Sequence, residues 1–415
     1  MGILHDDVVV VRQSENEGEP TVITVNCPDK TGLGCDLCRI LLFFGLSIVR
    51  GDVSTDGKWC YIVFWVVPKP SIRWDTSKWE LLKRRLVQAC PSCSSAYGIS
   101  YYRSELLSPK PPDVFLLKLF CSDRKGLLHD LTTVLCNLEL NIKKVKVSTT
   151  PDGTVMNLFF VTDTREILHT KKRQEETYEA LKHVMQASMM SCNIEKVGPE
   201  IAACCKASLS PPSAIIDDIF PLRDVQGASK CITSNNVSVV MDNSLSPAHT
   251  LVQIVCQDHK GLLYDIMRTL KDYNIQISYG RFYIKQGRKC EIDLFIMQAD
   301  GNKIDPGKQH ALSSRLQMEL LQPLRVAVIS RGPDTELLVT NPVESSSKGR
   351  PLVFHDITLA LKLLNTGIFS VLPQLYAVCR LLYKILLIDN VHMVSRKATA
   401  RKPALPLATR AFRLY

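Results

Sequence analysis

The chain has 415 residues and an ordinary globular composition, with 46% hydrophobic and 22% charged residues. Its net charge is +10, but the segment from Val371 onward holds eight Lys or Arg against one Asp, so the preceding residues carry only +3 and predict no specific nucleic-acid interface. The sequence opens without a basic and apolar leader and has no run of about 18 apolar residues, so we expect a cytoplasmic or nuclear protein that is neither secreted nor membrane-spanning.

One phrase occurs three times along the chain: CPDKTGLGCDL from Cys27, CSDRKGLLHDL from Cys121 and CQDHKGLLYDI from Cys256. An apolar, β-branched run precedes each copy and predicts a strand, and apolar residues at helical spacing follow it. A strand, a turn, a second strand and an amphipathic helix come next, and a short strand closes the copy. The sequence therefore predicts an α+β protein of tandem ferredoxin-like β-α-β-β-α-β repeats.

The copies and their flanks divide the chain into six segments. We assign repeat 1 to residues 1–107 with an extra strand at 8–12, repeat 2 to 112–198, a linker to 199–236, repeat 3 to 237–332 with an extra strand at 237–243, an incomplete repeat 4 to 333–370 and an atypical basic tail to 371–415. The two extra strands are expected at sheet edges. The closing strands of repeats 1 and 3 are predicted at YGISYY (97–102) and LRVAVIS (324–330).

Repeat 4 departs from the pattern. Leu352 stands where the other repeats have Gly, and no strand–turn–strand pattern is recognised after Ser370. The tail is then either a basic amphipathic segment that contacts membrane or nucleic acid, or the product of altered splicing or a mistaken gene model, which the interrupted domain favours. Repeats 1 and 2, and repeats 3 and 4, are expected to pair, with either dimerisation through an exposed edge of repeat 3 or a less stable C-terminal half.

The repeated loop has the chemistry of a small anion site. The first amides of a helix lack intrahelical partners and that end of the helix is electropositive, while glycine permits positive φ and close approach of a ligand. An Asp and neighbouring cations in each loop suit the ammonium and carboxylate of a free amino acid. The same Asp and Gly are also common as N-cap and turn residues, so a purely structural role stays open.

The three phrases in their β-α-β-β-α-β setting closely resemble ACT domains, and the layout from Val8 to about Phe369 resembles the plant ACT-domain-repeat family. The resemblance implies a non-catalytic regulatory protein with an unknown downstream protein partner. Its domains would pair side by side and bind free amino acids between the first loop of one domain and a strand of its neighbour. The implied ligand residues are Asp29, Lys30, Gly32, Leu33, Asp123, Arg124, Gly126, Leu127, Asp258, His259, Gly261 and Leu262.

Gly34 stands where the other two loops have Leu. If only one loop binds the ligand, we therefore expect loop 2 or loop 3 rather than loop 1. The main alternative function is a ligand-free protein–protein scaffold, and a lesser one is a regulator related to uridylyltransferases. No nucleotide-binding or hydrolase motif appears, so we expect neither an enzyme nor a cofactor. The two Cys-x-x-Cys pairs could bind zinc, but small core thiols are the favoured interpretation. The His-Asp pairs that begin at His129 and His355 could bind a metal, but residues on a helix surface are the favoured interpretation.

Overall fold

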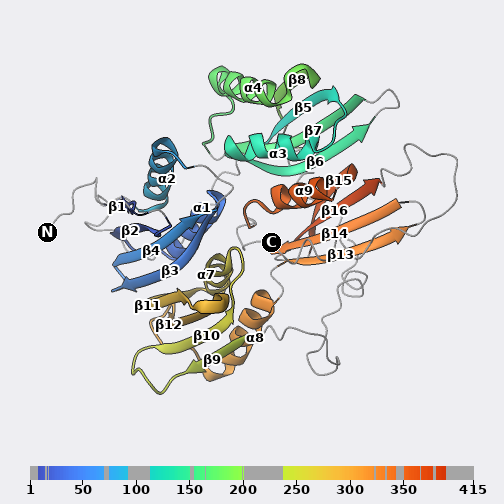
Figure 1. Cartoon of the computed structure of the whole chain (residues 1–415). Helices are drawn as coiled ribbons and strands as arrows, with labels where there is room; N and C mark the ends of the chain where they lie inside the picture. The colour runs from blue at the N-terminus through green and yellow to red at the C-terminus, as the bar shows by residue number, and fades with distance from the viewer. Residues whose placement is uncertain are drawn as a thin grey trace. The chain divides into compact units, whose positions relative to one another are not determined.

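The computed structural model describes residues 8–14, 16, 18–69, 74–91, 113–149, 154–163, 165–198, 200, 237–321, 324–331, 334–342, 350–364, 366–376 and 380–388. The chain forms two compact units. The first unit contains repeats 1 and 3, and the second contains repeats 2 and 4 (Figure 1). The expected pairing of repeat 1 with 2 and of repeat 3 with 4 is therefore wrong.

The first unit is built on one continuous antiparallel sheet of eight strands, in the order β1-β2-β4-β3-β11-β12-β10-β9. Repeat 1 contributes β1 (Val9–Arg12), β2 (Thr21–Pro28), α1 (Leu33–Phe43), β3 (Leu46–Thr55), β4 (Trp59–Pro68) and α2 (Thr76–Ala89). Repeat 3 contributes β9 (Ser238–Asp242), β10 (Thr250–Gln257), α7 (Leu262–Asp272), β11 (Ile275–Ile284), β12 (Lys289–Gln298) and α8 (Pro306–Leu321). The two repeats join where β3 pairs with β11, and α1 packs against α7.

The second unit holds two four-stranded antiparallel sheets, β6-β7-β5-β8 and β13-β14-β16-β15. Repeat 2 contributes β5 (Phe115–Ser122), α3 (Leu127–Asn137), β6 (Leu140–Thr149), β7 (Thr154–Asp163), α4 (Lys171–Met185) and β8 (Met189–Lys196). Repeat 4 contributes β13 (Arg325–Arg331), β14 (Asp334–Pro342), α9 (Val353–Leu363), β15 (Gly367–Tyr376) and β16 (Arg380–Ile388). Helices α3 and α9 pack together. Strands β6 and β15 lie beside each other, but their described residues belong to two separate hydrogen-bonded sheets.

The tandem ferredoxin-like fold is confirmed, but the edge strands differ from the expectation. Within the described residues, a closing strand is seen in repeat 2 alone, where β8 pairs with β5. The corresponding edge in the other repeats is a preceding strand, because β1, β9 and β13 pair with β2, β10 and β14. The extra strands at 8–12 and 237–243 are thus edge strands, as expected. The segment 324–330 does not close repeat 3, and 97–102 lies outside the described residues.

Repeat 4 is not half-built. The segment after Ser370 continues β15 and then forms β16, which lies between β14 and β15 and pairs with both. Val371 and Ile385 are completely buried. The boundary at residue 370 is therefore wrong, and so is the argument for altered splicing that rested on an interrupted domain. Residues 389–415 of the expected basic tail lie outside the described residues.

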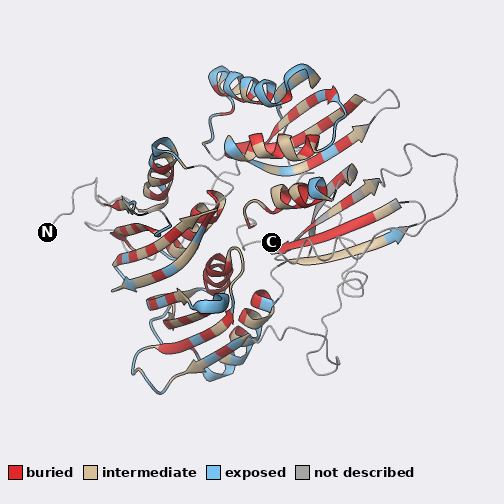
Figure 2. Ribbon diagram, in the orientation of Figure 1, coloured by how far each residue is buried: buried red, intermediate tan, exposed pale blue. Residues whose placement is uncertain are grey.

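Buried residues alternate along most strands and follow one side of most helices, whereas α7 is buried on all sides from Leu262 to Leu270 (Figure 2). In β4, for example, Cys60, Ile62, Phe64 and Val66 are buried while their neighbours are not. Period-2 burial in strands and period-3.6 burial in helices place the apolar core between the sheet and the helices that cover one of its faces. Each compact unit has its own extended core cluster.

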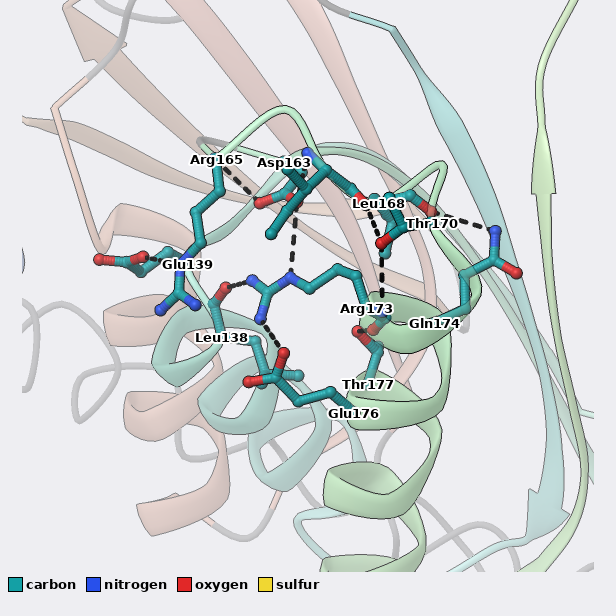
Figure 3. A network of polar contacts seen from close by, with 11 residues as sticks. Leu138, Glu139, Asp163, Arg165, Leu168, Thr170, Arg173, Gln174, Glu176 and Thr177 are labelled. Atoms are coloured by element: carbon teal, nitrogen blue, oxygen red, sulfur yellow. Dashed lines mark hydrogen bonds and ion pairs between the residues drawn. The ribbon is translucent and has the colours of Figure 1, made fainter.

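A buried arginine ties α4 of repeat 2 to its surroundings (Figure 3). The Arg173 side chain is 1% exposed, and its Nε lies 3.5 Å from an equally buried Asp163 carboxylate. Its guanidinium also donates to the Leu138 carbonyl and pairs with Glu176 at 2.9 Å. A buried charge is tolerated when opposite charges and hydrogen-bond acceptors surround it, so this cluster is a structural anchor.

The expected linker, residues 199–236, lies outside the described residues apart from Glu200. Within the described part of the chain, the helices are too short or too polar to cross a membrane.

Candidate functional site

A cavity of about 100 Å³ lies between repeats 1 and 3 within the first unit. Repeat 1 lines it with the loop residues 29–35 and with β3 and β4, and repeat 3 lines it with α7 and β11. A buried water needs only about 10–15 Å³ in this measure, so the cavity has room for a small organic molecule. Loop 1, the copy expected to be less suited to binding, therefore lines this cavity.

The loop end of the cavity is charged. Lys30 Nζ lies 3.1 Å from one oxygen of Asp36, and Lys271 Nζ of repeat 3 lies 3.5 Å from the other. Burial would raise the pKa of Asp36, but the two lysines outweigh it and lower this pKa below its ordinary value. Two ammonium groups thus share the Asp36 carboxylate, so each of them lies within reach of a second anionic group at the mouth of the loop.

Asp29 is the acidic group at the same end. Burial raises the pKa of its carboxyl, although the Thr55 hydroxyl donates to Oδ2 at 2.8 Å and the Lys30 backbone also stabilises the charged form. Asp29 therefore lines the cavity as a partly buried acceptor whose orientation is fixed by Thr55. A carboxylate held in this way could accept a hydrogen bond from a ligand ammonium group.

The rest of the cavity wall is mainly apolar. Asp52 and Arg281, which lie 3.6 Å apart, and Gln276 are its main polar side chains. Its apolar side chains come from both repeats, and they are Leu33, Val53, Ile62, Phe64, Leu263, Met267, Leu270, Ile275, Ile277, Phe282 and Leu294. Ligand sites commonly combine such a wall with a few placed polar groups. The cavity therefore suits a compact molecule with a charged head and an apolar body.

Two glycines lie on the floor of the cavity. Gly51 in β3 and Gly280 in β11 both line it, and each sits two residues after the β-bulge of its strand. The matching positions of β6 and β15 hold Val145 and Val371, which are buried.

The two glycines differ in the room around them. A Cβ on Gly51 would meet Phe64 at 3.5 Å, an ordinary contact, so Gly51 leaves space that a valine fills in the second unit. A Cβ on Gly280 would come within 2.7 Å of both Leu294 and Val53, so close packing requires glycine there.

The expected ligand residues of loop 1 all reach the cavity: Asp29, Lys30, Gly32 and Leu33. Gly32 has φ +79°, and Leu33 begins α1 as a buried residue. The left-handed conformation explains why a glycine stands at this helix start.

The expected ligand residues of loop 2 do not line this cavity. Asp123 and Arg124 are largely exposed, and the Arg124 guanidinium pairs with Asp130 at 2.5 Å. Gly126 has φ +75° beneath the side chain of Lys362, and Leu127 is buried in the core. Loop 2 thus repeats the backbone of loop 1 with its charges paired across the helix start.

The expected ligand residues of loop 3 do not line this cavity either. Asp258 pairs with Arg288 at 3.1 Å, and His259 Nε2 lies 3.2 Å from the fully buried Asp265. Gly261 has φ +79°, and Leu262 is a core residue. In loop 3 the same backbone conformation positions the charged residues for ion pairs and Leu262 for the core.

Several residues of the cavity were not among those predicted. Lys271, Gly51 and Gly280 lie outside the repeated phrase, and the last two sit in strands that the sequence did not show to be neighbours. The substitution of glycine for valine at the same strand position was the available signal. It becomes readable only when the bulges of the four strands are aligned.

The described cysteines form no disulfide, and the described residues include no group of three His, Cys, Asp or Glu that could hold a metal ion. Cys35 and Cys38 of the first Cys-x-x-Cys pair are buried in α1, and burial raises the pKa of Cys35 to about 11. Cys93 lies outside the described residues. His129 and His355 stack on each other, with ring centroids 4.8 Å apart, between α3 and α9.

Family models match each of the four repeats. They are "ACT domain-containing protein ACR10, N-terminal" at residues 11–91, "ACT domain" at 115–177, "ACR9-like, ACT-like domain" at 238–334 and "ACT domain-containing protein ACR9, C-terminal" at 335–403. The third match includes β13, although β13 pairs in the sheet of repeat 4. Together with the fold, the matches define a protein built of tandem ACT domains.

Two proteins of Arabidopsis thaliana are similar over most of their length. ACT domain-containing protein ACR10 is 66% identical over 376 residues, which is 89% of each chain. ACT domain-containing protein ACR9 is 52% identical over 376 residues, which is 89% of this chain and 88% of that protein. The chain therefore belongs to the plant ACT-domain-repeat family.

An enzyme also shows a partial likeness. The bifunctional uridylyltransferase/uridylyl-removing enzyme of Azospirillum brasilense is 24% identical over 180 residues, covering 43% of this chain and 17% of the enzyme. The similarity is thus confined to a small part of that enzyme.

Proposed function

We propose that this protein is a non-catalytic regulator that binds a free amino acid in the cavity between repeats 1 and 3. The observation that carries the proposal is the cavity itself, which loop 1, β3 and the neighbouring α7 and β11 enclose. Membership of the ACT-domain-repeat family supports it, because such domains commonly bind amino acids between paired copies. A bound ligand would touch both repeats and so stabilise their pairing.

The chemistry of the wall supports a zwitterionic ligand. Lys30 and Lys271 can attract a carboxylate, and Asp29 can accept from an ammonium group. The apolar side chains between helices and sheet would cover a hydrophobic side chain of the ligand.

A screen of the twenty amino acids by thermal unfolding tests the proposal. All four tryptophans (Trp59, Trp65, Trp74 and Trp79) lie in repeat 1, so their fluorescence reports on the first unit. A ligand at 100 times its dissociation constant should stabilise this unit by about 2.7 kcal/mol. The Gly51→Val variant, which carries the residue of the matching position in repeat 2, should melt cooperatively and lose the response.

A smaller variant guards against overpacking. Gly51→Ala adds one methyl group in ordinary contact with Phe64 and should weaken the response while keeping the fold. If none of the amino acids shifts the melting of the wild-type protein at millimolar concentration, the ligand-free protein–protein scaffold becomes the better account. A ligand response that Gly51→Val leaves intact would place the site elsewhere.

The scaffold is the second candidate, and one observation favours it. The sheet face of the first unit opposite the helices carries partly exposed aromatic side chains, among them Tyr61 and Tyr279 at 49% and 39% exposure. The predicted contact between copies through an edge of repeat 3 would use β9, because β11 is already paired with β3. A uridylyltransferase-related role is a lesser candidate that rests on the partial likeness alone.

A further inference from the structure

The two loops of the first pair do not receive the same partner residue. Lys271 follows Gly261 by ten residues, and the residue ten positions after Gly32 is Leu42. Lys271 of α7 reaches over loop 1, whereas the matching residue of α1, Leu42, is a buried leucine. Loop 1 thus receives a lysine from the neighbouring repeat, and the matching residue of repeat 1 is uncharged.

The stem of this lysine lies directly on the glycine of loop 1. A Cβ at Gly32 would come within 2.6 Å of both Cδ and Cε of Lys271. The ammonium group is then held beside the first turn of α1, 3.5 Å from Asp36, with 26% of the side chain exposed. The lysine is therefore fixed in direction by packing while its head stays in contact with solvent.

The second unit contains the same lysine, with valines at the positions of the two glycines. Lys362 of α9 crosses Gly126 in the same way and pairs with Asp130 at 2.8 Å, and Arg124 binds the other oxygen of Asp130. The floor beneath holds Val145 and Val371 in place of the two glycines. Lys362 is thus a natural comparison, since it has the position of Lys271 but not its cavity.

The corner at loop 3 holds different groups. Asp265, the counterpart of Asp36, is fully buried there, lies 3.2 Å from His259 and interacts electrostatically with the buried Arg268. The residue that matches Lys271 in the other repeat is Leu42, which has no charge. Only loop 1 of this pair therefore has a lysine of the neighbouring repeat at this position.

We propose that Lys271, acting from repeat 3, is the residue that selects a carboxylate in the cavity of repeat 1, and that each chain binds one apolar carboxylate at loop 1. The proposal rests on the proposed function. It adds that the carboxylate is the essential group of the ligand, that Lys271 binds it, and that each chain has one site. The carboxylate lies against Lys271 and Lys30, and the apolar body lies over Gly51 and Gly280. The ligand amino group contributes through Asp29 but is not required.

Three probes of one carbon skeleton test this assignment by isothermal titration. L-leucine carries both charged groups, 4-methylpentanoate lacks the amino group, and 3-methylbutylamine lacks the carboxylate. We expect L-leucine and 4-methylpentanoate to bind with one site per chain and 3-methylbutylamine to bind at least tenfold more weakly. Equal binding of the amine, or two sites per chain, would overturn the proposal.

A pair of matched variants separates the roles of the two lysines. Lys271→Met keeps an aliphatic stem over Gly32 and should weaken the two carboxylates by about ten- to a hundredfold, with little effect on the amine. Lys362→Met makes the same change in the second unit and should leave all three affinities unchanged. Equal weakening of all three probes by Lys271→Met would mean that the lysine only supports the fold, and the proposal would fail.

The outcomes also distinguish this proposal from the proposed function. If another amino acid stabilises the wild-type protein in the thermal screen but none of the three probes binds, the regulatory site stands and the apolar carboxylate is wrong. If nothing binds in either experiment, both are wrong.

Discussion

A left-handed residue begins the first helix of every repeat. Gly32, Gly126 and Gly261 have φ between +75° and +79°, and Leu352 takes the same conformation at +63°. The sequence predicted the three glycines as turn residues, because only glycine adopts positive φ without strain. The structure shows that the backbone turn is kept in repeat 4 even though its glycine is absent, so the turn belongs to the fold and the ligand role must come from other residues.

A comparison of two glycines separates backbone strain from the contact with Lys271. Gly32 and Gly301 both have positive φ, but a Cβ would touch Lys271 only at Gly32, while Gly301 faces open space away from the cavity. We expect Gly32→Ala and Gly301→Ala to lower the free energy of unfolding by a similar 1–2 kcal/mol, roughly the cost of a left-handed alanine, since the lysine stem can bend away. Only Gly32→Ala should also weaken the ligand response. Urea denaturation with tryptophan fluorescence gives the first quantity, and an undiminished ligand response in Gly32→Ala would contradict the role of Lys271.

At the scale of elements, the sequence predicted helices and strands well where three copies agreed. It failed at β15 and β16 because Pro373, Arg380 and Lys384 interrupt the apolar pattern of Val371–Ile388. The structure accounts for two of these residues. Pro373 is tolerated because β15 is an edge strand of its sheet, and Lys384 pairs with the buried Glu336 at 2.5 Å. Local pattern alone could not supply the partners that make these residues acceptable.

The contact of α3 with α9 predicts a pH dependence. Burial, followed by the charges of His355 and Lys362, lowers the pKa of His129 to about 4, against the opposing effect of Asp130. Because the folded-state pKa lies below the ordinary value of 6.5, the unfolded chain binds the extra proton more readily between these values. The contribution of neutral His129 is therefore complete above about pH 6.5 and is lost as the pH falls toward 4.

The matched variant is His129→Gln, which can keep a hydrogen bond to Thr358 but does not titrate. Urea midpoints followed by circular dichroism should fall more steeply with decreasing pH in the wild type than in His129→Gln. Parallel pH profiles would show that His129 is not the group responsible.

At the scale of the whole molecule, the pairing of repeats was the feature that the sequence could not give. Repeat 1 pairs with repeat 3 through β3 and β11, and repeat 2 shares a unit with repeat 4. Neighbours in the chain were expected to pair because short connections are the usual case. The choice is made instead by which strand surfaces fit, as in the match of Gly280 with Val53 and of Gly51 with Phe282 across β11 and β3. Three predicted loops were consequently placed correctly along the chain without showing which one meets a cavity.

Truncation tests the division into units. A chain that ends after Ser370 lacks β16, which joins β14 to β15, and the second unit should not fold. A chain that ends after Ile388 keeps all described strands and should melt like the full chain. Tryptophan fluorescence of the first unit should be unchanged in both, while circular dichroism should show the loss of the second unit only in the shorter one. Loss of the tryptophan transition in the shorter chain would show that the units do not fold separately.

Hydrogen–deuterium exchange tests most directly that the cavity between repeats 1 and 3 is the ligand site. The amino acid that gives the largest thermal shift would be compared with buffer alone at saturating concentration. The account predicts slower exchange in residues 29–35 and 50–55 of repeat 1 together with 275–282 of repeat 3, with no change in 123–127. Protection confined to loops 2 or 3, or to a single repeat, would contradict a site shared by repeats 1 and 3.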